Sequence, residues 1–197
     1  MMPSEPKQLQ EYKDIICSSD FLVDVIEKLA EIMRELNIKD YSLSGGAVYQ
    51  IVWNYKLSQG LQYGLGDLDV VYYDNCLSEE KEAYAQDRVR EHLAYQKYPV
   101  EVTNQARVHL WNKSMHHVES NSLTSLEDAI ASWMPLCACV GIRKTEEGLL
   151  VIAPYGLDDI FNLTVRPNNK PEKSQTVYNQ KVLKWSELWR DLTVIPW

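Results

Sequence analysis

The sequence predicts an α/β (α+β) protein with a central mixed β-sheet flanked by helices, and with a C-terminal hairpin and helix extension. Segments with the apolar spacing of a helix alternate with short segments rich in β-branched and aromatic residues. The predicted order of helix, strand, helix, strand, helix, strand is typical of a layered domain. The length of 197 residues fits one domain, 1–197, with a core at about 20–112 and a C-terminal elaboration at about 113–197.

The first predicted elements surround a pair of glycines. Asp20 is expected to cap a helix over about Phe21–Leu36, where apolar residues recur at helical spacing. Tyr41–Ser44 is predicted to be a short strand that ends at the two glycines, and Ala47–Leu57 to be the helix that follows. The β-branched and aromatic stretch Asp67–Tyr73 predicts the next strand.

The second half of the chain is predicted to add helices, one strand and a hairpin. A polar helix over Glu79–Gln96, capped by Ser78, leads to a strand at Pro99–Thr103. Ala106–Trp111 is expected either to continue that strand or to begin another. The remaining elements are a helix, a hairpin, a short helix and a terminal helix, predicted at Leu126–Trp133, Cys139–Arg143 with Leu149–Ala153, Pro154–Phe161 and Val182–Leu192.

Charge is distributed unevenly along the chain. The sequence has 28 acidic and 20 basic side chains, a net charge of −8. Residues 1–132 carry 21 acidic and 12 basic side chains, whereas residues 133–197 carry 7 and 8. This balance argues against a chain devoted to coating nucleic acid or an anionic membrane. The acidic excess fits either a solvated surface or a set of carboxylates gathered into a cation site.

The sequence is expected to belong to a cytoplasmic protein. The first residues, Met1–Lys7, lack the basic and apolar regions of a signal peptide. The apolar stretch Trp133–Ile142 is too short to span a bilayer. Four cysteines without a secretory signal are expected to be free thiols rather than a disulfide framework.

Gly45 and Gly46 follow Ser44 at the junction of a predicted strand and a predicted helix. Glycines at such a point let backbone N–H groups approach a ligand closely, and the helix N-terminus favours phosphate. A glycine pair is also common in ordinary tight turns, so this feature alone does not decide the function.

Three acidic residues lie on predicted strands. Asp67 and Asp69 are two residues apart, so their carboxylates are expected to point to the same face. Adjacent carboxylates repel one another, and Mg²⁺ prefers a sparse carboxylate set completed by water and phosphate oxygens. Glu101 lies between Val100 and Val102, where an acidic side chain needs water, a partner or a metal. Each residue alone also fits a solvent-facing position at a strand.

Taken together, these features resemble the nucleotidyltransferase superfamily related to DNA polymerase β. More closely, the chain resembles a bacterial family of uncharacterised nucleotidyltransferase-like proteins, over about 41–166. The stretches that carry the resemblance are Ser44–Gln50 (SGGAVYQ), Asp67–Tyr72 (DLDVVY), Asn104–Trp111 (NQARVHLW) and Ala153–Phe161 (APYGLDDIF).

The resemblance implies a nucleotidyltransferase fold and Mg²⁺-dependent transfer of an NMP from an NTP to a hydroxyl acceptor by a two-metal mechanism. By resemblance, the catalytic metal ligands are Asp67, Asp69 and Glu101. They would hold two Mg²⁺ ions, or Mn²⁺. Ser44 and the two glycines are implied to cradle the phosphates of the NTP co-substrate. The expected acceptor is a small molecule, a protein side chain or an RNA end. A long nucleic acid is disfavoured by the net charge, and no membrane partner is expected.

Further residues are candidates to contact the nucleotide. Arg107 and His109 are two apart on a segment expected to be extended, so both are candidates to face the cleft. Arg107 is predicted either to bind a phosphate or to form a structural salt bridge. Asn104 and Gln105 are candidates to hydrogen-bond a base or ribose, or to pair with backbone. One tryptophan is a candidate to stack on a nucleobase, but the sequence does not indicate which.

Other functions are weighed against the enzyme. A zinc site at Cys137 and Cys139, or at the pair His116-His117, is rejected because neither has the spacing of structural zinc sites. The alternative is a non-catalytic nucleotide-binding or regulatory module on the same fold. A third possibility is a cytoplasmic interaction protein with solvated carboxylates. The complete carboxylate pattern favours the enzyme.

Overall fold

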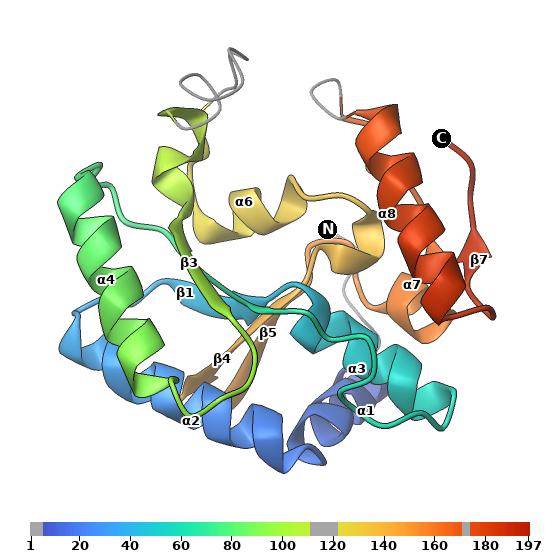
Figure 1. Cartoon of the computed structure of the whole chain (residues 1–197), viewed down its shortest axis with the longest axis horizontal. Helices are drawn as coiled ribbons and strands as arrows, with labels where there is room; N and C mark the ends of the chain where they lie inside the picture. The colour runs from blue at the N-terminus through green and yellow to red at the C-terminus, as the bar shows by residue number, and fades with distance from the viewer. Residues whose placement is uncertain (1–5, 111–121, 171–173) are drawn as a thin grey trace.

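A five-stranded sheet forms the centre of the molecule (Figure 1). The computed structural model describes residues 6–110, 122–170 and 174–197, so the positions Trp111 and His116-His117 lie outside the described residues. The order of the strands is β3–β2–β1–β4–β5. Their bounds are β1 (Tyr41–Ser44), β2 (Leu68–Tyr72), β3 (Val100–Asn104), β4 (Gly141–Thr145) and β5 (Gly148–Ile152).

The sheet is mixed, as predicted. Strands β2 and β3 run parallel, whereas β1 is antiparallel to both β2 and β4, and β4 is antiparallel to β5. The predicted C-terminal hairpin is present as β4–β5. Because β4 pairs with β1, the hairpin extends the main sheet rather than standing apart from it. A small parallel pair is formed by β6 (Thr164–Val165) and β7 (Thr193–Val194).

Helices surround the sheet. Strand β4 is contacted by α2, and β3 by α4. No helix among the described residues is long and apolar enough to cross a bilayer. The helices are α1 (Pro6–Cys17), α2 (Asp20–Glu35), α3 (Gly46–Lys56), α4 (Glu79–His92), α6 (Leu126–Ala131), α7 (Asp158–Phe161) and α8 (Gln175–Leu188), with the 3₁₀ helices η1 (Gln105–Arg107) and η2 (Leu136–Ala138).

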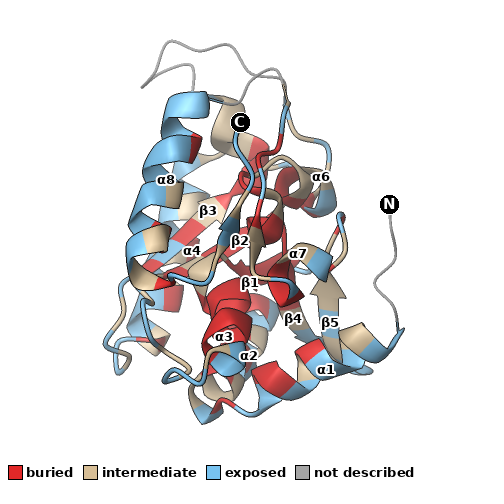
Figure 2. Cartoon of the chain, turned by 90° about the vertical axis from the view of Figure 1, so that its right-hand side faces the viewer, coloured by how far each residue is buried: buried red, intermediate tan, exposed pale blue. Residues whose placement is uncertain are grey.

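The two faces of the sheet differ in chemistry. Successive side chains of a strand point to opposite faces. In β2, Leu68 and Val70 are fully buried in the main core, which includes apolar residues of α2, α3 and α4. Asp69 and Val71 therefore point to the other face, where Val71 joins a smaller apolar cluster with Leu126 of α6. Figure 2 shows the buried residues gathered on α3 and the central strands, whereas much of α8 is exposed.

The predicted extended segment Ala106–Trp111 is wrong in its described part. Strand β3 ends at Asn104, whose side chain accepts a hydrogen bond from the Ala106 N–H and turns the chain into η1. Residues 108–110 continue as helix. A local bond from an asparagine side chain to the backbone outweighs the strand tendency of the following residues.

Two helix starts also differ from the predictions. Ser19, not Asp20, caps α2 by accepting a hydrogen bond from the Leu22 N–H. The terminal helix α8 begins after Ser174 and ends at Leu188, earlier at both ends than predicted. In the first half of α8 the buried residue is Tyr178. That part of the sequence therefore has little of the apolar periodicity that predicts a helix.

Asn54 of α3 ties together the loop before β2 and the end of α8. Its side-chain N–H₂ donates to the backbone oxygens of Leu61 and Tyr63, at 3.0 and 2.9 Å. Its oxygen accepts a hydrogen bond from Trp189 Nε1 at 2.7 Å. Asn54 is 1% exposed, its bond to Trp189 is buried, and its bonds to Leu61 and Tyr63 are partly buried. They hold the loop that leads into β2 against both helices.

Replacing Asn54 by alanine is expected to destabilise the protein. The substitution leaves the buried Trp189 N–H and two partly buried backbone oxygens without partners, which costs about 1–3 kcal/mol. The free energy of unfolding in urea measures the effect. The control is Asn179→Ala on the exposed side of α8, which is expected to change it by less than about 0.5 kcal/mol. Equal stabilities of the two variants would contradict this role of Asn54.

Candidate functional site

Strand register brings three sequence-predicted site residues into one row. In the β1–β2 pair, Ser44 lies opposite Asp69, and in the β2–β3 pair Asp69 lies opposite Glu101. Residues directly opposite one another on neighbouring strands point to the same face. Asp67 precedes β2 by one residue and lines the same cavity as Asp69. The two aspartates therefore line one cavity, as their spacing predicts, although Asp67 lies just outside the strand.

The glycine turn lies directly against Asp69. Gly45 has φ 67° and ψ −154°, a conformation that is essentially restricted to glycine. A β-carbon on Gly45 would overlap Oδ2 of Asp69. Gly45 is also the N-cap of α3 and provides no side-chain cap, so the first N–H groups of the helix remain available to a ligand. The turn and the carboxylate thus form one continuous surface.

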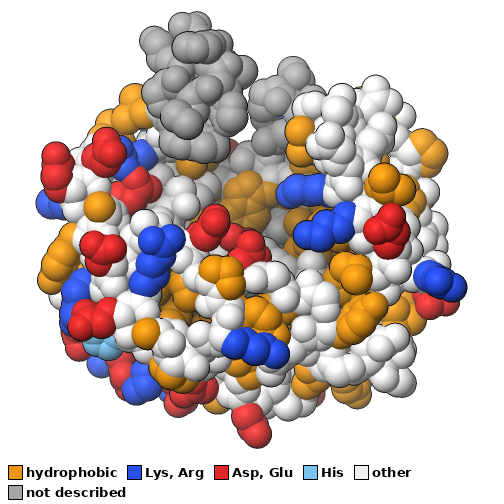
Figure 3. Space-filling model, in the orientation of Figure 1, with side chains coloured by type: hydrophobic (Ala, Val, Ile, Leu, Met, Phe, Trp, Pro, Cys, Tyr) orange, Lys and Arg blue, Asp and Glu red, His pale blue; other side chains and the backbone are white. Residues whose placement is uncertain are grey.

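A cavity of about 850 Å³ opens over this surface. One wall holds the glycine turn with Asp67 and Asp69, and the opposite wall is formed by α8 with Lys181 and Lys184. Figure 3 shows a hollow with acidic side chains on one side and Lys or Arg side chains across from them. A cavity with carboxylates on one wall and ammonium groups on the other suits a ligand that carries both phosphate groups and cations.

Asp69 lies in an environment that disfavours its charge. Burial raises its pKa to about 6, and the nearby carboxylates of Asp67 and Glu101 contribute to the increase. Lys181 acts in the opposite direction, because its positive charge lowers the pKa of Asp69. The Lys181 ammonium also donates to the backbone oxygen of Met134 at 3.3 Å. A bound cation would relieve the repulsion among the carboxylates of Asp67, Asp69 and Glu101.

Two residues of the cavity wall were not among the sequence predictions. Lys181 and Lys184 lie three residues apart on α8 and therefore share one face of the helix. In the sequence, the i, i+3 spacing of the two lysines is the feature that could have indicated a shared helix face. The predicted helix began after Lys181, however, and nothing in the sequence placed that helix near the aspartates.

Gln50 is a further cavity residue that sequence reasoning missed. It is 8% exposed, and its amide lies against Gly46, where a β-carbon would come within 2.9 Å of it. Its Nε2 donates to the Tyr49 hydroxyl at 3.2 Å, while its Oε1 has no hydrogen-bond partner among the described residues. A buried polar atom without a partner next to the glycine turn fits a group that a ligand completes.

Ser44 lines the cavity but is itself fully buried. Its hydroxyl shares a hydrogen bond of 2.8 Å with the hydroxyl of Ser42. Gly141 of β4 lies opposite Ser44, and a β-carbon there would come within 2.6 Å of Ser42 Oγ. The close approach of β4 therefore fixes the two serine hydroxyls beneath the glycine turn.

The carboxylates form no ready-made metal cage. Among the described residues, no three His, Cys, Asp or Glu side chains are close enough to hold one ion. Glu101 is exposed and is not among the residues that line the cavity. Asp67 and Asp69 still fit Mg²⁺, which usually binds one or two carboxylates and completes its shell with water and substrate phosphates. That Glu101 completes the metal site stays a prediction.

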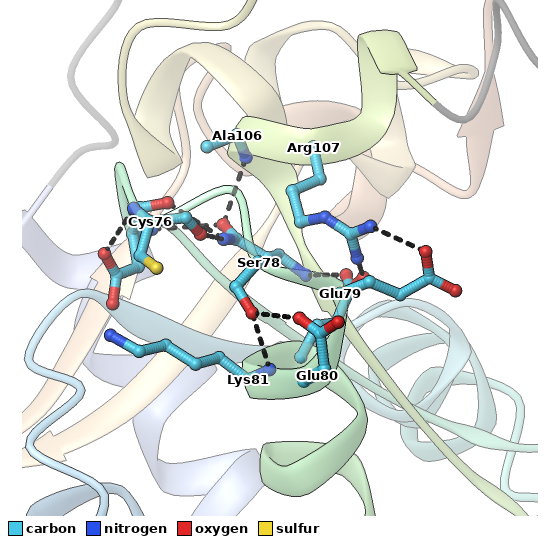
Figure 4. Close-up of polar contacts among 10 residues, drawn as sticks. Cys76, Ser78, Glu79, Glu80, Lys81, Ala106 and Arg107 are labelled. Carbon is cyan, nitrogen blue, oxygen red and sulfur yellow. Dashed lines mark hydrogen bonds and ion pairs between the residues drawn. The ribbon is translucent and has the colours of Figure 1, made fainter.

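Arg107 has the contacts of a structural ion pair. Its guanidinium pairs with Glu82 of α4. A second nitrogen lies 3.6 Å from Glu79, on the same helix (Figure 4). Neither Arg107 nor His109 is among the residues that line the cavity. Of the two alternatives for Arg107, the contacts are those of the salt bridge rather than of a phosphate ligand.

The amides of Asn104 and Gln105 are used differently. Asn104 is 2% exposed, and its side chain donates to the backbone oxygens of Asp74 and Cys76. Its oxygen accepts bonds from the N–H groups of Asp74 and Ala106. Gln105 lines the cavity instead. The structure thus assigns Asn104 to the backbone and leaves Gln105 facing the site.

Two comparisons with known proteins found a match. A family model described as "Nucleotidyltransferase" matches residues 31–194, a longer span than the resemblance found from the motifs. A solved NMR structure, described as revealing a CCA-adding enzyme head domain, is similar with a TM-score of 0.76 and 28% identity. The similarity covers 95% of this chain and 96% of that chain. No curated protein matches. The chain belongs to this nucleotidyltransferase family.

Proposed function

We propose that the protein transfers an NMP from an NTP to a hydroxyl acceptor in a Mg²⁺-dependent reaction. The observation that carries the proposal is the packing of the Gly45 turn against Asp69 at the start of α3. This arrangement joins a phosphate-binding helix N-terminus to a carboxylate whose charge needs a cation. Membership of a nucleotidyltransferase family supports the same activity.

Each wall of the cavity has a proposed task in binding the NTP. The free N–H groups at the start of α3 receive phosphate oxygens, and Gly45 and Gly46 keep that approach open. Lys181 and Lys184 supply positive charge from the opposite wall. Ser44 stays beneath the turn, where its hydroxyl is held by Ser42. Arg107 is left out of this proposal because its contacts are those of an ion pair with α4.

Asp67 and Asp69 are proposed to hold Mg²⁺ against the triphosphate, with Glu101 beside Asp69 in the row. In the reaction, the acceptor hydroxyl releases its proton to water and its oxygen forms a bond to the α-phosphorus. The bond from that phosphorus to the oxygen that bridges to the β-phosphate breaks, and pyrophosphate leaves. Bound divalent cations would activate the attacking hydroxyl and steady the leaving pyrophosphate. Asp69 is the nearest neighbour of Glu101 across the strands, so Glu101 is the proposed third carboxylate of the set.

The similarity to a CCA-adding enzyme head domain makes an RNA end a natural acceptor to test. A small molecule and a protein side chain are tested beside it. The second candidate function is a non-catalytic nucleotide-binding module. Its support is the absence, within the described residues, of three metal-binding side chains close enough for one ion.

The test incubates the protein with Mg²⁺, each α-labelled NTP, and either total RNA or RNA-free cell extract. We expect label transfer that Asp67→Ala and Asp69→Ala reduce by about 100-fold or more. Asp87→Ala, an exposed residue on α4, is the control and should leave transfer unchanged. Transfer that survives both cavity substitutions would overturn the site assignment. Mg²⁺-dependent NTP binding without any transfer would favour the non-catalytic module.

Removing the charge of Asp69 is expected to stabilise the metal-free protein. The carboxylate is largely buried beside Asp67 and Glu101, and burial raises its pKa. Asp69→Asn keeps the shape and removes the repulsion, so the melting temperature without Mg²⁺ should rise by about 2–4 °C. Thermal unfolding at neutral pH measures this rise. Adding Mg²⁺ with ATP should stabilise the wild type more than the variant. A lower melting temperature of Asp69→Asn would contradict the prediction.

Alanine at Gly45 is expected to abolish nucleotide binding. A β-carbon there displaces the Asp69 carboxylate, and the backbone conformation alone costs about 1–3 kcal/mol for a residue other than glycine. Gly148→Ala is the matched control, because Gly148 also has a positive φ of 114° but open space around it. Isothermal titration with ATP and Mg²⁺ separates the two. If both variants bind ATP equally, the contact between Gly45 and Asp69 is not needed for binding.

A further inference from the structure

The cavity has two chemically different halves. The charged half holds the glycine turn, the two aspartates and the two lysines. The second half is uncharged, and it includes Val71, Thr103, Gln105 and Trp133. Val71 and Thr103 lie opposite each other on β2 and β3, two residues beyond the row of Asp69 and Glu101. That step is about 7 Å along a strand. A nucleotide has the same division, with charged phosphates at one end and an uncharged ring at the other.

Three aromatic side chains line the cavity, and the rings of two of them pack against other aromatic rings. Tyr49 and Trp185 are 4% and 7% exposed. Their ring centroids lie 5.4 Å apart, and each also packs against Trp53, at 5.0 and 5.5 Å. Little ring surface is left on either side chain for a ligand.

Trp133 is different. It is only partly buried, and its ring makes no aromatic contact with another side chain in residues 6–110, 122–170 and 174–197. Beneath it lies the small apolar cluster that contains Val71 and Cys139. The ring therefore has a supported side, together with surface that remains open to the cavity.

The backbone of Trp133 is firmly held. Its carbonyl oxygen accepts a hydrogen bond from Asn168 Nδ2 at 2.7 Å and one from Cys139 Sγ at 3.3 Å. Asn168 is 5% exposed, and it also donates to the oxygen of Ala131 at the end of α6. A side chain that starts from a held backbone and packs against an apolar cluster loses less freedom when a ligand stacks on it.

Gln105 provides a polar group in the same half of the cavity. It is 6% exposed, and its amide makes no hydrogen bond to any other residue that the structure describes. An amide offers a donor and an acceptor side by side, which suits the edge of a nucleobase.

We propose that Trp133 is the platform on which the nucleobase of the NTP stacks, and that the Gln105 amide hydrogen-bonds the edge of that base. This inference rests on the proposed function, because it places the phosphates at Gly45 and Asp69. A tryptophan ring can stack on any of the four bases, because each base has an aromatic face. Trp133 therefore sets the affinity for all four NTPs, and Gln105 sets the order of preference among them.

The test compares ligands with and without a base by isothermal titration in Mg²⁺. ATP, GTP, CTP and UTP carry a base, and inorganic tripolyphosphate does not. We expect Trp133→Ala to weaken binding of all four NTPs by about 10- to 100-fold and to leave tripolyphosphate binding unchanged. Trp133→Phe keeps an aromatic face and should retain most of the affinity. Trp197→Ala, outside the cavity lining, is the control. Gln105→Leu should change the ratios among the four dissociation constants.

The outcomes separate this inference from the proposed function. Unchanged NTP affinity in Trp133→Ala, or equal losses for NTP and tripolyphosphate, would overturn the platform while leaving the phosphate site standing. Unchanged ratios in Gln105→Leu would overturn the role of Gln105. If Trp133→Ala does not fold, Trp133→Phe decides, because loss of NTP affinity in that folded variant contradicts stacking. A wild type that binds neither NTP nor tripolyphosphate would overturn the proposed function together with the platform.

Discussion

The carboxylate of Asp69 occupies the space that a side chain on Gly45 would need, and the site depends on this contact. The contact leaves no room for a side chain at the start of α3, so the N-terminus of that helix and the carboxylate lie directly side by side. The antiparallel register of β1 and β2 creates the contact by placing Ser44 opposite Asp69. The parallel register of β2 and β3 then places Glu101 on the other side of Asp69. One pair of registers thus assembles residues from three strands.

The site is closed by helix α8, and aromatic packing holds that helix in place. Trp185 and Trp189 both pack edge-on against Trp53 of α3, with ring centroids 5.5 and 5.3 Å apart. Asn54 adds a buried hydrogen bond to Trp189 and holds the loop that leads to Asp67. Because α3 also begins at the glycine turn, the same helix positions that turn and supports the wall that holds Lys181 and Lys184. The core and the candidate site therefore share their supports.

Polar side chains near the end of β3 divide into those bonded to other parts of the protein and one that lines the cavity. Asn104 satisfies four backbone groups, and Arg107 pairs with Glu82 of α4. These bonds fix the turn from β3 into η1. With Asn104 committed to backbone groups and Arg107 paired with α4, Gln105 lines the cavity between them. The residue type alone therefore does not identify a ligand-binding side chain. The bonds that each side chain already makes within the protein decide whether it remains available to a ligand.

The sequence by itself determined the elements around the glycine turn and the identity of the acidic residues. Strand Tyr41–Ser44, the helix after it and the mixed sheet were predictable, because short-range patterns of apolar residues, glycines and caps set them. Only the tertiary structure decided what faces the aspartates. Lys181 is distant in the chain from Asp69, and the packing of α8 against α3 brings its charge near enough to lower the pKa of Asp69. The tryptophan that is free to stack on a base was likewise decided by contacts between residues that are distant in the sequence. Contacts on each ring separate Trp133 from Trp185, and no local pattern encodes those contacts.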